Sequence, residues 1–409
     1  MLIKLSWKNI WRNKVRSGVI LGAIAIGLFS GTYLSAFMSG WVVGSVNSDV
    51  ENHISQMQIH DTAFIANSDI NAFFKRNSVE EKISESGLKN DLKISYRLKL
   101  NGMLASASNA VGISANAVNA ADEKTVSKIW QQIPDSLGTF LPENARMPIV
   151  ISKKIAEKLK VKLKSKIVFT FTDSNGDMQN LAFRVCGIYK TTNAMLDETE
   201  VFVCIDDVFA LTSLPENAVH EAAVMTQNLE TCEKIYPQLK ALFPDFDVKD
   251  WKTVSPALAM TLEYTDFFAL LILGIFMLAL SFGIINTMLM AVLERTRELG
   301  MLGAIGMGKY KIFSMIMLET LFLTLIGSVT GIILGAVAIL PSINSGIDLT
   351  PLMSNNFEDF GFGSIIFPIL NIKTFVQITI LVIIAGILSA IYPAVKALKL
   401  KPLDAIRGF

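Results

Sequence analysis

Four long apolar runs constrain the fold of this chain more than any other feature of its sequence. Three of them, residues 18–48, 267–293 and 375–395, contain no charged side chain, and the fourth, residues 312–340, contains only Glu319. About 20 apolar residues suffice for a helix to cross the roughly 30 Å hydrocarbon core of a bilayer. The sequence therefore predicts an α-helical membrane protein with four transmembrane helices.

The first run is longer than a bilayer is thick, so its helix, residues 18–48, is expected to project beyond the membrane as a stalk. The second helix, residues 261–293, is expected to begin with a similar stalk. The apolar part of a cleavable signal peptide is only ~7–15 residues long, so we interpret the first run as an uncleaved span. The remaining transmembrane helices are predicted at residues 312–340 and 375–395.

A large polar segment, residues 49–260, separates the first two runs and predicts an α/β domain outside the membrane. Strand–helix–strand patterns at its two ends, residues 49–102 and 216–260, indicate one split α/β lobe. The strand-rich middle, residues 103–215, is interpreted as an inserted lobe.

Residues suited to thiol or metal chemistry are few. The three cysteines and three histidines are scattered without the spacing of a metal site. Cys186 and Cys204 fall on strands that we expect to be neighbours, where we favour two free thiols over a disulfide. The sequence offers no nucleophile–base set, and its net charge of +1 gives no reason to expect a nucleic-acid partner. We therefore expect this chain to be no enzyme and to hold no metal or cofactor itself.

The placement of basic residues predicts the orientation of the chain. Lysine and arginine are concentrated at residues 1–17, in the turn at residues 294–311 and in the tail at residues 396–409, whereas the loop at residues 341–374 is mildly acidic. The positive-inside rule then places both termini and the turn in the cytoplasm and the large domain on the opposite side.

Residues 1–17 combine basic side chains with apolar ones at roughly helical spacing. This pattern predicts an amphipathic helix in the cytoplasmic membrane interface, with Trp7 and Trp11 at headgroup depth. A basic flank that only sets the topology is the alternative interpretation.

The charged, glycine-rich turn at residues 294–311 has three interpretations. A P-loop would need Ser or Thr after Gly308-Lys309 and a strand before its first glycine. Tyr310 follows instead, and an apolar helix precedes, so nucleotide binding is disfavoured. A solvated hairpin is the simplest interpretation, and we favour a short docking helix, centred on residues 302–308, that is presented to a cytoplasmic partner. The residues assigned to this coupling element are Glu294, Arg295, Arg297, Glu298, Leu302, Ile305, Gly306 and Met307.

Glu319 is the only carboxylate in the four apolar runs, and an acid in a membrane is costly enough to suggest a role. By helical rise it lies only about 12 Å beyond Lys311. We therefore favour pairing with a basic residue of the N-terminal helix or the tail over proton coupling.

Small residues recur at every fourth position in two runs, which lets helices approach one another closely. This packing is expected at Gly27, Gly31, Gly327, Gly331 and Gly335. The pattern leaves open whether the partner helix belongs to the same chain.

Several motifs resemble the FtsX-like permeases of ABC transporters. They are Gly283-Ile284-Ile285-Asn286-Thr287-Met288, Glu294-Arg295-Thr296-Arg297-Glu298-Leu299-Gly300, Ala304-Ile305-Gly306 and Tyr392-Pro393-Ala394. The segments Arg12-Asn13-Lys14-Val15-Arg16-Ser17 and Lys401-Pro402-Leu403-Asp404-Ala405-Ile406-Arg407 resemble the terminal patterns of the family. The resemblance covers the whole membrane part, whereas the external domain is similar in arrangement only.

The resemblance implies a permease subunit that works with a separate ABC ATPase dimer, which holds the ATP and Mg²⁺, and with a second permease copy or paralogue. It also implies that the external lobes are a porter-like lobe and an inserted sabre-like lobe, moved mechanically when the ATPase closes. The layout is similar to that of LolC and LolE, because Val248-Lys249-Asp250-Trp251 leads into the second helix. It departs from MacB because the chain begins almost at its first helix and has no Walker motif.

The expected function is therefore extraction of lipoproteins from the outer leaflet of a bacterial inner membrane. MacB-like export with an adaptor and an outer-membrane channel, and FtsX-like signalling to a cell-wall hydrolase, stay open as alternatives.

Large apolar side chains gather at the outer ends of the first two helices. Across a permease dimer these ends would form an apolar cleft that suits the acyl chains of a lipoprotein or a phospholipid. Interfacial anchors that touch only bulk lipid are the alternative. The residues assigned to this cleft are Phe37, Met38, Trp41, Val42, Tyr264, Phe267, Phe268 and Leu271.

Overall fold

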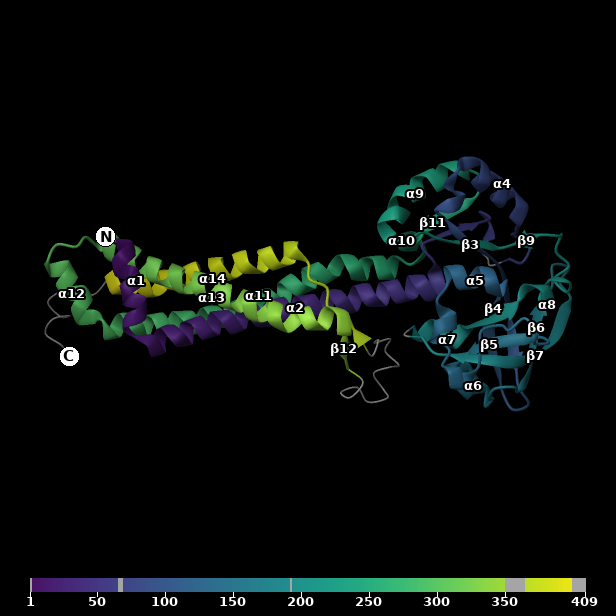
Figure 1. The fold of residues 1–409 in the computed structure, drawn as a ribbon, viewed down its shortest axis with the longest axis horizontal. Coiled ribbons are helices and arrows are strands. Elements are labelled where there is room, and N and C mark those ends of the chain that lie inside the picture. Colours follow the sequence, from purple (N-terminus) through teal and green to yellow (C-terminus); the bar gives the residue numbers. More distant parts are fainter. Residues whose placement is uncertain (1, 65–68, 192, 350–364, 399–409) are drawn as a thin grey trace. The chain divides into compact units, whose positions relative to one another are not determined.

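The computed structural model describes residues 2–64, 69–191, 193–349 and 365–398 (Figure 1). The chain divides into two units. The helical unit comprises the described parts of residues 1–43, 263–349 and 365–409, and the α/β unit comprises mainly residues 44–262. The expected terminal motif at residues 401–407 and most of the expected acidic loop lie outside the described residues.

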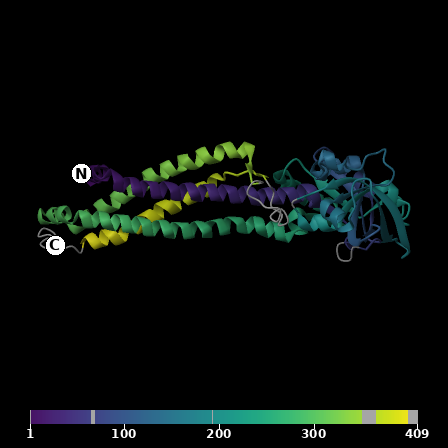
Figure 2. The same cartoon turned by 90° about the horizontal axis from the view of Figure 1, so that it is seen from below.

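Among the described residues, four helices are long and apolar enough to cross a membrane. They are α2 (Lys14–Asp49), α11 (Pro256–Glu294), α13 (Lys309–Ser345) and α14 (Ile372–Leu398). The predicted four membrane helices, with an α/β domain between the first and the second, are thereby confirmed. Figure 2 shows that helices of the helical unit run alongside one another.

Two helix boundaries differ from the expected ones. Helix α13 continues through Pro341, which we expected to follow the end of the third span, and ends before Gly346. Gly346 has φ +70°, a conformation that favours glycine, so it ends the helix where the proline does not. Helix α11 begins at Pro256, five residues before the predicted start, because a proline is well suited to the first turn of a helix.

The glycine stripe of α13 packs against α2 of the same chain. A Cβ atom added at Gly331 would lie 2.8 Å from the backbone oxygen of Ala25, and one added at Gly327 would lie 2.7 Å from a methyl carbon of Ile24. Gly31 of α2 is similarly close to Leu273 of α11. Within the described chain these small residues therefore serve intramolecular packing, which answers the question that the pattern left open.

One half of the α/β unit is a four-stranded antiparallel sheet with two helices on one face. Its strand order is β11-β1-β10-β3, which is the order of a split β-α-β-β-α-β fold. The strands are β1 (Met57–His60), β3 (Lys93–Ala105), β10 (Glu221–Met225) and β11 (Asp247–Asp250), and the helices are α4 (Arg76–Ser86) and α9 (Leu229–Leu242). Apolar residues of both helices and of alternate strand positions form its core.

The other half is a closed six-stranded barrel. Strand β3 pairs with β4, the chain of pairing continues through β8, β5, β7 and β6, and β6 pairs with β3 again. The further strands are β4 (Ala110–Val118), β5 (Pro148–Ser152), β6 (Lys166–Thr172), β7 (Met178–Tyr189) and β8 (Glu200–Cys204). Short helices flank them: α5 (Ala120–Val126), α6 (Lys153–Leu159), α7 (Ala194–Thr199) and α8 (Ile205–Phe209).

The two halves share strand β3. We expected a boundary between the two lobes at residues 102 and 103, but this position falls inside strand β3. The strands on its two sides belong to one continuous sheet. Cys186 and Cys204 lie on β7 and β8. We expected these two strands to be neighbours, but β5 lies between them. The three cysteines are free thiols.

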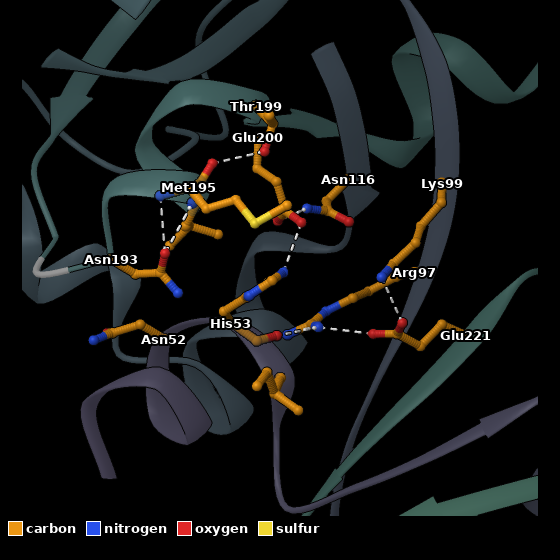
Figure 3. A network of polar contacts seen from close by, with 12 residues as sticks. Asn52, His53, Arg97, Lys99, Asn116, Asn193, Met195, Thr199, Glu200 and Glu221 are labelled. Carbon is orange, nitrogen blue, oxygen red and sulfur yellow. Dashed lines mark hydrogen bonds and ion pairs between the residues drawn. The ribbon is translucent and has the colours of Figure 1, made fainter. Parts of the chain in front are cut away.

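Buried charges join the sheet to the barrel. Arg97 of β3 donates to Glu123 of α5 at 2.6 Å. It also donates to Glu221 of β10 at 2.8 Å, and Lys99 lies 2.7 Å from the same Glu221 (Figure 3). The two cations balance the two carboxylates, as burial of charge requires. Beside them, Glu200 of β8 accepts from Asn116 at 2.7 Å.

The carboxylate of Glu200 should contribute to the free energy of unfolding in a way that depends on pH. Burial by itself would raise its pKa, but His53, Lys99 and Asn116 together lower that pKa from 4.5 to about 2. A carboxylate with a lowered pKa in the folded state stabilises the fold above pH 4.5, and this contribution is lost as the pH falls toward 2. The pKa difference corresponds to about 3 kcal/mol at neutral pH.

We predict that Glu200→Gln lowers the free energy of unfolding of the α/β unit at pH 7 but not near pH 2. Urea unfolding of the full chain, followed by tryptophan fluorescence at a series of pH values, measures this difference. Glu233→Gln, which alters an exposed pair with Lys252, is the matched control and should change stability by less than ~1 kcal/mol at every pH. Parallel pH profiles for the wild type and Glu200→Gln would contradict the assignment.

Candidate functional site

A cluster of short helices forms one end of the helical unit. Helix α1 (Leu2–Arg12) and helix α12 (Thr296–Ala304) both lie at this end (Figure 1). Ser6 of α1 is buried and donates to the backbone oxygen of Met315 of α13, at 3.2 Å. The rings of Trp7 and Phe322 are nearly perpendicular, with their centroids 5.6 Å apart. The predicted N-terminal helix is thus present, but it is docked on α13 and ends at Arg12, whereas we expected it to occupy all of residues 1–17.

Glu319 is held by a network that connects three segments far apart in sequence. Arg295 donates through Nη1 to both carboxylate oxygens of Glu319, each at 3.2 Å. Asn9 of α1 donates to the Oε1 atom of Glu319 at 2.6 Å, and its own backbone oxygen accepts from Nη2 of Arg295 at 2.9 Å. The Glu319 side chain is only 8% exposed. The network therefore ties α1, the start of α12 and α13 into one body.

The cation that pairs with Glu319 is not one of those we expected. We expected a basic residue of the N-terminal helix or the tail, but the N-terminal helix contributes the neutral Asn9, and the cation is Arg295 of the coupling element itself. A second link, between Arg12 of α1 and Glu298 of α12, is exposed to solvent. Arg295 and Glu298 thus make contacts inside the chain.

The end of α12 explains why Gly306 and Met307 follow Leu302 at this spacing. The backbone N–H of Met307 donates to the oxygen of Leu302 at 2.9 Å, and that of Gly306 donates to the oxygen of Gly303 at 3.1 Å. These are the two hydrogen bonds of a Schellman motif, which needs a left-handed residue such as Gly306, with φ +100°. Leu302 and Met307 pack against the core of the helical unit. The docking helix therefore spans residues 296–304, earlier than the segment 302–308 that we expected.

The side chains of this element that are exposed to solvent differ from the expected set. Ile305 is 85% exposed, and Glu294 and Arg297 are exposed as well. Leu302 and Met307 face the core instead. Sequence reasoning missed Met301, which is 50% exposed and lies one helical turn before Ile305, and Tyr310, which is 81% exposed. The spacing of four residues between Met301 and Ile305 is the signal that could have identified Met301.

The expected substrate cleft is not assembled within one copy of the chain. A small apolar groove of about 20 Å³ lies between α2, α11 and α14, and Met38 is the only predicted cleft residue that lines it. Leu34, Leu270 and Phe276 line it as well. The groove therefore brings together only one of the eight residues that were assigned to the cleft.

The other predicted cleft residues lie apart from this groove. Val42 is buried, and Phe37 and Trp41 are partly buried on α2. The four residues from α11 are exposed: Tyr264, Phe267, Phe268 and Leu271. Any cleft that uses these four side chains needs a second surface. Among the described residues, no group of three His, Cys, Asp or Glu side chains could hold a metal ion.

We predict that removing one partner of the Arg295–Glu319 pair destabilises the helical unit more than removing both. Glu319→Leu leaves a buried cation without its acid, which costs about 3–5 kcal/mol. The double variant Glu319→Leu/Arg295→Met should recover most of this loss, because both charges are replaced by apolar groups. Thermal unfolding in detergent, followed by size-exclusion chromatography, measures the effect.

The control for this experiment is Glu298→Leu, since its pair with Arg12 is exposed and should be worth less than ~1 kcal/mol. Equal melting temperatures for Glu319→Leu and Glu298→Leu would show that the buried pair does not hold this end together.

Comparison with known proteins identifies part of the chain. Residues 270–402 match the family described as FtsX-like permease C-terminal. An uncharacterized ABC transporter permease of Methanocaldococcus jannaschii is 25% identical over 55% of this chain and 55% of its own length. The uncharacterized ABC transporter permease YvrN of Bacillus subtilis is 26% identical over 56% of each chain. The chain thus spans about half the length of the curated relatives it matches.

A macrolide export ATP-binding/permease protein MacB, from Chlorobaculum tepidum, is 32% identical over 31% of this chain and 16% of its own length. Two solved structures resemble the chain weakly. The extracellular domain of the transporter YknZ from Gram-positive bacteria has a TM-score of 0.33 at 16% identity and covers 48% of this chain and 99% of that one. The periplasmic region of MacB from Actinobacillus actinomycetemcomitans has a TM-score of 0.35 at 12% identity. The match covers 52% of this chain and 95% of that one.

The matched residues contain the parts that form the candidate site. They include the greater part of α11, all of α12 and α13, and α14. The expected resemblance to FtsX-like permeases is confirmed, whereas the particular closeness to LolC and LolE stays a prediction. Residues 270–402 of the chain thus resemble the C-terminal part of the FtsX-like permeases.

Proposed function

We propose that this chain is the permease subunit of an ABC transporter of the FtsX/MacB type. In this proposal a separate ATPase dimer holds ATP and Mg²⁺, and the permease carries its motion to the α/β unit. The observation that carries the proposal is a set of exposed apolar side chains, here called the knob: Met301 of α12, Ile305 directly after α12, and Tyr310 at the start of α13. The segments that carry them are anchored by buried charge. An exposed apolar knob of this kind suits a protein partner better than water.

The anchoring is what would make the knob useful for coupling. A partner that pulls on α12 also pulls on α13 through Arg295 and Glu319, and on α1 through Asn9. The motion would then pass along α2 and α11, which are 36 and 39 residues long. At 1.5 Å per residue each helix is over 50 Å long, well beyond the roughly 30 Å core of a bilayer. By the positive-inside rule the knob would face the cytoplasm.

A second permease copy or paralogue is expected to lie against α11. Only 17% of the most apolar stretch of α11 is buried, against 39–44% in the other three long helices. A second copy there would also supply the second surface that the exposed residues of α11 lack. The alternative is that these side chains contact membrane lipid alone.

Extraction of lipoproteins from the outer leaflet of a bacterial inner membrane is the substrate assignment that we favour. It requires no polar pathway through the bilayer, and Glu319 is the only charged side chain in the four apolar runs. MacB-like export is the second candidate, because relatives at 29–34% identity carry the MacB name. Signalling to a cell-wall hydrolase is the third. A neighbouring gene for a second permease, an adaptor or a hydrolase would favour the first, second or third candidate respectively.

We predict that Ile305→Asp abolishes recruitment of the ATPase subunit and leaves the permease folded in the membrane. A charged side chain at the centre of an apolar contact would be buried without a partner on binding, which is strongly unfavourable. Co-purification of the ATPase and the ATPase activity of the complex measure the effect. Ile372→Asp, at a residue that is 80% exposed at the start of α14, is the matched control and should keep both. Normal recruitment by Ile305→Asp would reject the knob as the docking element.

We further predict that photo-cross-linking groups at Phe37, Trp41 and Phe268 capture a lipid-modified protein without ATP and release it when ATP is added. This result is expected if the outer ends of α2 and α11 meet those of a second copy. Mass spectrometry of the cross-linked products identifies what is captured. Products with phospholipid alone, indifferent to ATP, would reject the cleft and leave the ATPase coupling untouched.

A further inference from the structure

The first stalk enters the α/β unit through an unusual turn. Helix α2 ends at Asp49, and residues Val50–Ile54 form a single π-helical turn. The turn is closed by the backbone N–H of Ser55, which donates to the oxygen of Val50 at 2.8 Å. Ser55 then has φ +65°, a conformation that non-glycine residues rarely adopt. Local strain of this kind persists only where the surroundings determine it, so the contacts of the turn require an explanation.

One residue of the turn, His53, contacts the barrel and the buried charges at once. Its Nε2 atom lies 2.7 Å from Oε1 of Glu200, at the start of β8 (Figure 3). Its backbone oxygen accepts from Nη1 of Arg97 at 3.1 Å. Arg97 in turn holds Glu123 of α5 and Glu221 of β10. His53 therefore connects the stalk to the barrel by its side chain and to the junction of both halves by its backbone.

The residues around His53 add contacts to both halves. Glu51 accepts twice from Lys128, once from the backbone N–H and once from Nζ, each at 2.8 Å. Gln56 accepts from the backbone N–H of Thr226, beside β10, at 2.8 Å through its side chain. The backbone oxygen of Gln56 accepts from the backbone N–H of Trp251 at 2.9 Å. Trp251 begins the short helix α10 (Trp251–Val254), which precedes α11.

These contacts place the turn where the sheet, the barrel and the segment that leads to the second long helix converge. Arg97 is 3% exposed, and both of its carboxylate partners are fully buried. Moving one of these buried charges away from its partners would leave the partners unpaired in an apolar environment, which is costly. The network therefore resists changes in the positions of the segments that it connects. The polar face of the sheet thus binds the end of the stalk, and its apolar face is covered by α4 and α9.

We propose that residues 50–56 are a joint that fixes the first stalk to both halves of the α/β unit, with His53 and Arg97 as its positioning residues. Motion of the stalk then moves the sheet and the barrel together as one rigid body, so the two halves push a substrate without closing on it. The inference rests on the proposed function in that the stalk is taken to move and the α/β unit is taken to act on a substrate.

The test uses distance measurements between spin labels on the full chain in lipid nanodiscs, with the three native cysteines replaced by serine. One label is placed at Ser45 on the stalk, and the second is placed either at Glu81 of α4 or at Lys162 of the barrel half. We expect narrow distance distributions for both pairs in the otherwise unchanged chain.

His53→Ala should at least double the width of the distribution between positions 45 and 162, because the link to Glu200 is lost. The distribution between positions 45 and 81 should stay narrow, because Arg97 still binds the backbone oxygen of residue 53. His53→Gln keeps a hydrogen-bond donor toward Glu200 and should restore most of the narrow distribution. Arg97→Lys cannot reach three acceptors at once and should broaden both distributions.

Glu233→Gln, which alters the exposed pair with Lys252, is the matched control and should leave both widths unchanged. If His53→Ala does not fold, as judged by near-ultraviolet circular dichroism, Glu200→Ala carries the same prediction for the distance to the barrel, because it removes the acceptor of the His53 side chain. Unchanged widths in folded His53→Ala or Glu200→Ala, or equal broadening in Glu233→Gln, would overturn the joint. These measurements need no ATP and no ATPase, so their outcome is independent of whether the proposed coupling is correct.

Discussion

The ion pair between Arg295 and Glu319 is the interaction on which the helical unit depends most. A carboxylate that is 8% exposed among apolar helices is tolerated only if its charge is matched and its oxygens are hydrogen-bonded. Arg295 and Asn9 satisfy both requirements. The consequence is geometric, because the three segments that supply these groups come from the N-terminus, from the turn and from the third long helix. A short exposed helix thereby becomes a rigid part of the helical unit.

The α/β unit uses the same physical device at the end of the first stalk. Arg97 binds two buried carboxylates and the backbone of His53, as Arg295 binds a buried carboxylate and the backbone of Asn9. In both places an arginine is suited to the task because its planar guanidinium reaches several acceptors in fixed directions. Removing a single partner from such a network costs far more than the pair contributes in net stability. Two buried networks therefore hold the two ends of a proposed path for motion.

The sequence predicted those features that depend on local patterns. Apolar runs located the four long helices, and strand–helix–strand patterns located β1, α4 and β3 and later β10, α9 and β11. The pairings between distant residues could not be predicted, because no pattern within a segment records its partner. For this reason the predicted partner of Glu319 was wrong, and the pairing of β3 with β6 that closes the barrel was not predicted. Leu302 and Met307 were assigned to the docking surface, but both pack against the core of the helical unit. Their hydrophobicity alone does not indicate whether they face a partner or the core.

The knob of Met301, Ile305 and Tyr310 is proposed to receive an ATPase subunit. The most direct test is to place a photo-cross-linking group at Tyr310, purify the full chain in lipid nanodiscs, and identify the proteins that are cross-linked. An ABC ATPase subunit should be captured from position 310 and not from position 372, at the start of α14. Capture of no ATPase from position 310, or equal capture from both positions, would contradict the assignment of the knob as the docking surface.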